Sequence, residues 1–186
     1  MCMISDNAGE PLWFAMSATF GRSMKAKEFL EGKEVRCFVP MKYAMVNDRR
    51  QGKVRRLVPA INNLIFVHTT KEHIQALKTG MKYLQYLTKQ EGSRNVPIIV
   101  PERQMQQFIT VCDTYSSDLV YLSPEEVNLS KGTPVRMIGG AFDGIEGLFV
   151  KVDGKRRKRV AVMVQGIAAV MITEFTEGYL QVLDNQ

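Results

Sequence analysis

Clustered cations are the residues of this sequence whose types and spacing point most clearly to chemistry, and that chemistry is the binding of phosphate. Between Arg22 and Arg56, eleven basic residues stand against four acidic ones. The chain of 186 residues has a formal net charge of +6 and a pI of about 9.3. A solvated face is the usual explanation of scattered charge, but here the surplus is local. It predicts that part of this stretch contacts a polyanion.

A second cationic run lies near the C-terminus, where five basic residues are consecutive. Two interpretations fit such a run: a solvated hairpin turn, or a contact with RNA, DNA or an acidic protein surface. The pattern alone favours neither. The run consists of Lys155, Arg156, Arg157, Lys158 and Arg159.

Residues that could support catalysis or hold a metal do not form a recognisable motif. His68 and His73 are five residues apart, unlike the i, i+4 pair of a helical zinc site. The three cysteines have no CxxC spacing, and a nucleophile pair of Cys37 with a histidine has no supporting signature. Neither a GxxxxGKS/T loop nor a GxGxxG loop is present. The sequence therefore predicts a protein that is not an enzyme, with no cofactor and no metal.

The sequence also gives an expectation about location. No apolar run approaches the ~18 residues of a membrane-spanning helix. The first eleven residues contain Asp6 and Glu10 but no basic residue, unlike a signal peptide. We therefore expect residues 1–11 to be a short leader and the protein to be cytoplasmic, without a membrane partner.

Strands and helices are expected to alternate over the first two thirds of the chain. The apolar run 64–67 is typical of a buried central strand. Ser23 is expected to cap a helix and Gly32 to end it. The other expected elements are strands at 12–19, 35–43 and 83–87, a long hairpin or mobile loop at 45–58, and helices at 23–30, 71–78 and from Pro101 onward.

Only strands are expected in the last third, and this change of composition marks a domain boundary. We expect one domain at 12–115, a linker at 116–130 and a second domain at 131–186. A flexible linker of this length would span roughly 20 Å. Leu119, Val120 and Leu122 leave open that part of it packs on a domain.

Both predicted domains resemble parts of NusG-type transcription factors. The glycine-rich stretch 133–152, followed by the basic turn and the strand at 159–164, resembles the KOW motif, which also occurs in some ribosomal proteins. The first domain resembles the NusG N-terminal (NGN) domain. This likeness rests on Trp13-Phe14, Gly21-Arg22, Phe38-Val39-Pro40-Met41, a basic hairpin, Leu64-Ile65-Phe66-Val67 and Ile99-Val100-Pro101.

The resemblance implies a fold and a mechanism. The fold class is α+β: an NGN-type α/β sandwich, with an antiparallel sheet and flanking helices, followed by a small SH3-like KOW β-barrel. In this family the NGN domain binds the clamp helices of the RNA polymerase β′ subunit, bridges the DNA cleft and suppresses pausing and termination, and the β subunit is a further candidate contact. The implied polymerase-binding residues are Leu64, Phe66, Leu84 and Ile99, and the implied contacts with upstream or non-template DNA are Arg22, Lys25, Lys33, Lys78 and Thr79.

One departure from the family pattern favours a specialised paralogue. NusG proteins usually have Pro-Gly-Tyr or Pro-Asn-Tyr before the Leu-Phe-Val strand, whereas Pro59 is followed here by Ala60-Ile61-Asn62-Asn63, which places Leu64 at the aromatic position. The chain is similar to RfaH-like factors, and most similar to the UpxY-type antiterminators of surface-polysaccharide operons. A ribosome- or RNA-associated KOW protein without polymerase contact is the alternative.

RfaH-type C-terminal domains can be a helical hairpin or a β-barrel, and the residues here favour the barrel. β-Branched residues recur at 160, 162, 164, 170, 172 and 173, and each interior glycine would cost a helix about 1 kcal/mol. We expect a five-stranded barrel in a monomeric protein. A ribosomal small-subunit protein and a termination factor are candidate partners of the KOW domain.

Overall fold

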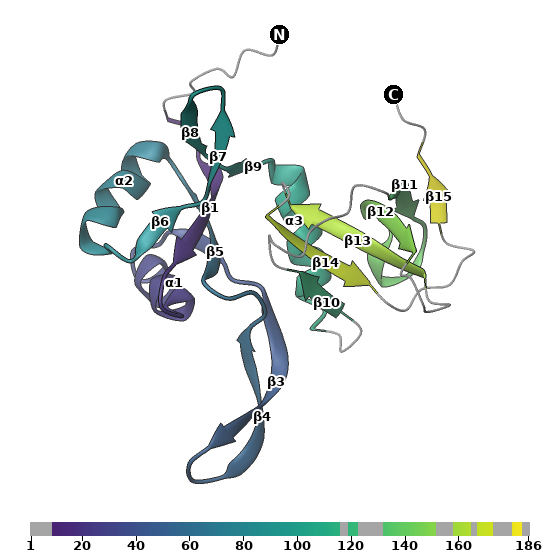
Figure 1. The fold of residues 1–186 in the computed structure, drawn as a ribbon, viewed down its shortest axis with the longest axis horizontal. Coiled ribbons are helices and arrows are strands. Elements are labelled where there is room, and N and C mark those ends of the chain that lie inside the picture. Colours follow the sequence, from purple (N-terminus) through teal and green to yellow (C-terminus); the bar gives the residue numbers. More distant parts are fainter. Residues whose placement is uncertain are drawn as a thin grey trace. The chain divides into compact units, whose positions relative to one another are not determined.

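The computed structural model describes residues 9–115, 119–122, 132–151, 158–164, 167–172 and 180–183. The chain divides into two compact units (Figure 1). The first contains the described residues up to Val39 together with Asn62–Glu102, and the second contains Pro40–Ile61 together with those from Arg103 onward. Each unit is built on an antiparallel sheet of its own. The mixture of antiparallel sheets with helices confirms the predicted α+β class.

The sheet of the first unit is centred on the two apolar strands that the sequence predicted. β1 (Leu12–Ala18) lies between β5 (Leu64–Thr69) and β6 (Leu84–Tyr86). β2 (Arg36–Phe38) pairs with the other edge of β5, and β9 (Ile99–Val100) pairs with β1. The central strands are almost fully buried, as continuous apolar runs require.

The two faces of this sheet carry different residues, because side chains alternate along a strand. Phe14 lies opposite Val67 and shares one face with it, which we call the Phe14 face. Ala15 lies opposite Phe66, and these two share the other face, which we call the Phe66 face.

Helix α1 (Ser23–Glu31) lies on the Phe14 face. Its Ala26 and Leu30, four residues apart, are buried. The backbone carbonyl of Lys27 accepts a hydrogen bond from the thiol of Cys37, and Cys37 lies on the Phe14 face because it is paired with Val67. The predicted cap by Ser23 is wrong. The N-cap residue is Arg22, which makes no side-chain cap, while Ser23 begins the helix and is 1% exposed.

Helix α2 (Lys71–Gly80) has the cap that α1 lacks. The Thr70 hydroxyl accepts a hydrogen bond from the backbone N–H of His73 at 3.2 Å. Its Ile74 is fully buried. After β6, a hairpin of β7 (Thr88–Glu91) and β8 (Arg94–Pro97) completes the unit; the sequence patterns did not predict this hairpin.

The second unit begins with a long hairpin of β3 (Met41–Asp48) and β4 (Gly52–Pro59) (Figure 1). Of the two alternatives expected at 45–58, a long hairpin or a mobile loop, the structure shows the hairpin. Helix α3 (Glu102–Cys112) follows later in the chain, with Met105, Phe108 and Val111 fully buried along one side.

Among the described residues, the C-terminal sheet contains six strands in the order β10-β14-β13-β12-β11-β15, one more than the five expected, because β10 pairs with β14. The prediction of strands rather than helices is confirmed at 160, 162, 164, 170 and 172, while position 173 lies outside the described residues. The strands are β10 (Leu119–Leu122), β11 (Thr133–Met137), β12 (Glu146–Lys151), β13 (Lys158–Val164), β14 (Ala168–Ile172) and β15 (Leu180–Val182), with a short 3-10 helix, η1 (Gly140–Phe142), between β11 and β12.

Strand β10 comes from the stretch 116–130, where a linker was expected. It pairs along its whole length with β14. Its Tyr121 donates a hydrogen bond to the backbone carbonyl of Met41 at 3.1 Å, and burial raises the pKa of this phenol well above its usual range. Part of the stretch is therefore a structural strand of the second unit.

Two glycine positions explain why the C-terminal sheet needs glycine. At Gly147 in β12, a Cβ atom would lie 2.6 Å from the backbone oxygen of Ala161 and 2.9 Å from Val160 Cγ1, so only glycine lets β13 approach. Gly140 has φ +70 at the start of η1, a conformation that other residues rarely adopt.

Candidate polymerase and nucleic-acid interface

Arg22, a predicted DNA contact, lies beside two aromatic rings. Its guanidinium carbon is 5.5 Å from the ring centre of Phe20 and 5.3 Å from that of Tyr83. Phe20 is 85% exposed and has φ +62. A positive φ is uncommon for a bulky residue, so contacts with neighbouring residues must hold the backbone of Phe20 in this conformation.

The neighbours that hold the turn come from distant parts of the chain. The backbone N–H of Gly21 donates to Asn63 Oδ1 at 2.8 Å, and the N–H of Thr19 donates to the carbonyl of Tyr83 at 3.0 Å. Asn63 belongs to the connection in which this chain departs from the usual NusG pattern. The departure thus supplies the residue that positions the turn before Arg22.

Lys78 also lies against an aromatic ring. Its Nζ is 4.0 Å from the ring centre of Tyr86, and burial lowers the pKa of Lys78. Burial, together with the charge of Glu72, raises the pKa of Tyr86. The neighbouring Thr79 donates its hydroxyl to the carbonyl of Ala76 and is exposed.

The remaining predicted DNA contacts, Lys25 and Lys33, are exposed side chains at the two ends of α1. Lys25 is in the first turn and Lys33 follows the C-cap Gly32. The predicted set therefore includes two cations stacked on rings, Arg22 and Lys78, and two free to reach a phosphate. Phe20, Tyr83 and Tyr86 were missed, although the Phe20-Gly21-Arg22 sequence offered a local signal.

The four predicted polymerase-binding residues do not share one face. Leu64 and Phe66 are on the Phe66 face, whereas Leu84 is on the Phe14 face, opposite Ala18. Leu64, Phe66 and Leu84 are buried, at 3%, 0% and 0% exposure, and Ile99 is 39% exposed. Ile99 is thus the member of the set that a partner can reach without any rearrangement.

Glu102 organises the surroundings of Trp13 at the start of β1. The indole N–H of Trp13 donates to Glu102 at 2.7 Å, and Arg36 lies 5.0 Å over the indole ring. His68 stacks on Trp13 with ring centres 4.9 Å apart, and its Nε2 is 3.8 Å from the same carboxylate. These contacts give Trp13 and His68 a structural role.

Of the C-terminal basic run, only part can be placed. Residues 155–157 and the side chain of Lys158 lie outside the described residues, and Arg159 is half-buried in β13. Within the described parts of the chain, no group of three His, Cys, Asp or Glu side chains could hold a metal ion. The described helices include none long and apolar enough to cross a membrane.

Comparisons with known proteins give the family. The profile of the family described as "Transcription termination factor nusG" matches residues 11–109. A comparison with curated protein sequences found no match.

Among solved structures, one described as "Domain interaction in Thermotoga maritima NusG" aligns at 15% identity with a TM-score of 0.48, covering 94% of this chain and 98% of the other. A second, described as "Crystal Structure of MjSpt4:Spt5 complex conformation B", aligns at 15% identity with a TM-score of 0.29 and the same coverage. The profile match extends over more than half of the chain, and on that basis the protein belongs to the NusG family of transcription factors.

Proposed function

We propose that the protein is a transcription elongation and antitermination factor. It would bind RNA polymerase at the clamp helices of the β′ subunit, bridge the DNA cleft and suppress pausing and termination. The observation that supports this proposal is the family match over residues 11–109, a span that includes β1, β5 and the turn before Arg22.

We propose polymerase contact through the sheet of the first unit, with Leu64, Phe66, Leu84 and Ile99 as the candidate residues. The three buried members would contribute by shaping the surface, since a direct contact would require their exposure. Ile99 is accessible, so a change there tests binding without disturbing the interior.

The test replaces Ile99 by Glu and measures binding to core RNA polymerase. A carboxylate in an apolar contact would remain unpaired, and we expect affinity to fall roughly tenfold or more. Ile138→Glu is the matched control, because Ile138 is 45% exposed and lies in the other unit. Equal affinity of both variants and the parent chain would contradict the proposed surface.

For the DNA contact we propose Arg22, Lys25, Lys33, Lys78 and Thr79. The exposed Phe20 ring beside Arg22 suits single-stranded non-template DNA, because an exposed aromatic ring can stack a base while a cation holds a phosphate. Crosslinking of a non-template strand to an Arg22→Gln, Lys25→Gln variant in a polymerase–DNA complex should decline, with a flatter dependence on salt.

The finer assignments follow from the resemblance and remain part of the proposal. The chain would be an RfaH-like paralogue of the UpxY type, acting in the cytoplasm as a monomer on surface-polysaccharide operons. A domain at 12–115 and a KOW domain at 131–186 would divide these tasks, and the linker proposed at 116–130 would consist of the residues of that stretch outside β10. The KOW domain would bind a ribosomal small-subunit protein or a termination factor. Co-purification with ribosomal subunits instead of polymerase would favour the alternative of an RNA-associated KOW protein.

A further inference from the structure

The hairpin of β3 and β4 carries a net positive charge nearly as large as that of the whole chain. Residues 41–59 contain six cations and one carboxylate, a surplus of +5 in a chain whose formal net charge is +6. All six cations are exposed. They are Lys42, Arg49, Arg50, Lys53, Arg55 and Arg56.

The strand register gives the hairpin two unlike faces. On one face the directly opposite pairs are Tyr43 with Leu57, Met45 with Arg55, and Asn47 with Lys53, and all six side chains are exposed. We call this the Tyr43 face. The opposite face contains four half-buried apolar residues, Ala44, Val46, Val54 and Val58, together with the exposed Lys42 and Arg56 and the half-buried Asp48.

The single carboxylate of the hairpin is already engaged. Asp48 Oδ1 accepts hydrogen bonds from the backbone N–H groups of Arg50 and Gln51, at 2.9 and 3.2 Å, and its Oδ2 accepts from the Arg56 guanidinium at 2.6 Å. These bonds hold the pKa of Asp48 below its usual value. Across the parts of the chain that the structure describes, Arg49, Arg50 and Lys53 form no ion pair.

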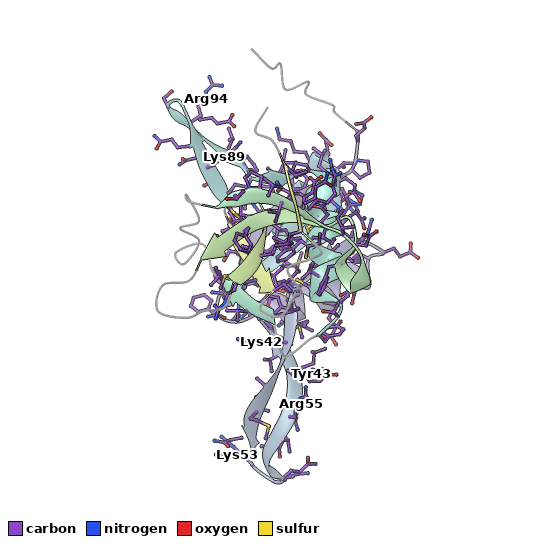
Figure 2. All side chains as sticks on the ribbon, turned by 90° about the vertical axis from the view of Figure 1, so that its right-hand side faces the viewer. Lys42, Tyr43, Lys53, Arg55, Lys89 and Arg94 are labelled. Carbon is purple, nitrogen blue, oxygen red and sulfur yellow. The ribbon has the colours of Figure 1, made fainter. Side chains whose placement is uncertain are left out.

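The polar and apolar residues of the Tyr43 face are separated along its length. Asn47 and Lys53 are next to the turn, and Tyr43 and Leu57 are toward the other end. Figure 2 labels Lys53 close to the turn and Tyr43 farther from it. The guanidinium of Arg55 covers the Tyr43 ring at 4.5 Å, and Tyr115 meets it edge-on at 6.3 Å. Because its ring is occupied in this way, Tyr43 is poorly placed to stack a nucleobase. This favours contact with a nucleic-acid backbone over stacking on a single strand.

The size of the hairpin determines which kind of double helix it can enter. Eight residues per strand make a ribbon about 27 Å long. The major groove of B-DNA, about 12 Å wide, admits a two-stranded β-ribbon. The major groove of A-form RNA is too deep and narrow for side chains to enter. We propose that the β3–β4 hairpin is a DNA-binding arm that places its turn in the major groove of double-helical DNA and holds phosphates through Arg49, Arg50, Lys53 and Arg55.

This binding requires no polymerase, so it can be tested separately from the proposed function. Fluorescence anisotropy of the full chain would be measured on a labelled 20-base-pair DNA duplex over a range of salt concentrations. We expect Lys53→Gln, Arg55→Gln to weaken binding about 10- to 60-fold at 0.1 M salt and to lower the salt slope by up to about 1.8, since each phosphate contact contributes about 0.9.

The control variant is Lys89→Gln, Arg94→Gln, which removes two exposed cations from the β7–β8 hairpin (Figure 2). This variant lowers the net charge by the same amount as Lys53→Gln, Arg55→Gln, and it should leave the salt dependence of duplex binding unchanged. A second variant, Arg49→Gln, Arg50→Gln, changes two residues of the turn, outside the paired strands. It should also weaken duplex binding, and it keeps the test valid if the substitutions within β4 perturb folding.

Four results would overturn the proposal: no binding to the duplex at low salt, equal losses in the two hairpins, tighter binding of single-stranded or hairpin RNA, or equally strong competition by an acidic polypeptide. Competition by the minor-groove ligand distamycin would overturn the assignment to the major groove.

Discussion

The hairpin of β3 and β4 and the hairpin of β7 and β8 are both two-stranded, antiparallel and largely exposed, yet their charges differ. Residues 88–97 contain two cations and one carboxylate, against six and one in residues 41–59. In the shorter hairpin, Lys89 forms an ion pair with Glu91 at 2.8 Å. In the longer one, the carboxylate of Asp48 neutralises Arg56 and leaves the other cations exposed.

This difference separates a structural hairpin from a binding one. Isolated two-stranded hairpins are marginally stable, and a surplus of one charge destabilises a folded segment further through self-repulsion. The charge of the β3–β4 hairpin therefore opposes its own folding, and a polyanionic partner gives that charge a function. The β7–β8 hairpin requires no such explanation.

Charge reversal should give the largest contrast between the two hairpins. We expect Lys53→Glu, Arg55→Glu to weaken binding of duplex DNA about 100-fold or more at 0.1 M salt, because two phosphate contacts become repulsions. Lys89→Glu, Arg94→Glu changes the net charge by the same amount and should have an effect of about threefold or less, through long-range electrostatics. Anisotropy with both variants provides the measurement. Similar losses would show that net charge, and not the β3–β4 hairpin, governs binding.

A smaller effect of opposite sign is expected from Asp48→Asn. The amide oxygen can still accept the backbone N–H groups of Arg50 and Gln51, while Arg56 loses its counter-charge. Duplex binding should tighten about three- to eightfold, which corresponds to up to one additional phosphate contact. The same assay measures it, with Glu91→Gln in the other hairpin as the control. Unchanged affinity for Asp48→Asn would show that Arg56 does not reach DNA.

The smallest effect concerns the acid stability of the turn. Two backbone N–H groups hold the pKa of Asp48 below its ordinary value of 3.8, so the charged form is favoured in the folded state. The resulting stabilisation is present above pH 3.8 and is lost as the pH falls through the lowered pKa. The NMR signals of the Arg50 and Gln51 amides should shift in this acid range. In Asp48→Asn they should not, and identical titrations of the two proteins would refute the assignment.

Local patterns were sufficient for much of the fold. The apolar run at 64–67 forms the first four residues of β5, and the basic stretch at 45–58 lies in the β3–β4 hairpin. The hairpin of β7 and β8 was missed because it lacks an apolar alternation, and its register depends on a two-residue turn in which Gly92 has φ +59. The prediction that Ser23 caps α1 was wrong, because Ser23 is buried as the first residue of the helix. Its packing against neighbouring residues, and not its preference for the N-cap position, determines where it lies.

By itself, the sequence determined the location of the positive charge, the strand character of the C-terminal third and the family likeness, because all three depend on residue types that are close together along the chain. Only the tertiary structure decided which residues meet. Thr19 and Tyr83 are 64 positions apart, yet their hydrogen bond brings the Tyr83 ring to Arg22. Likewise, Leu64 and Leu84 lie on opposite faces of one sheet, because Leu64 is paired with Ser17 and Leu84 with the next residue of β1, Ala18. The residue pattern within a single strand does not specify which residue of the neighbouring strand lies opposite, so this register could not be predicted from the sequence.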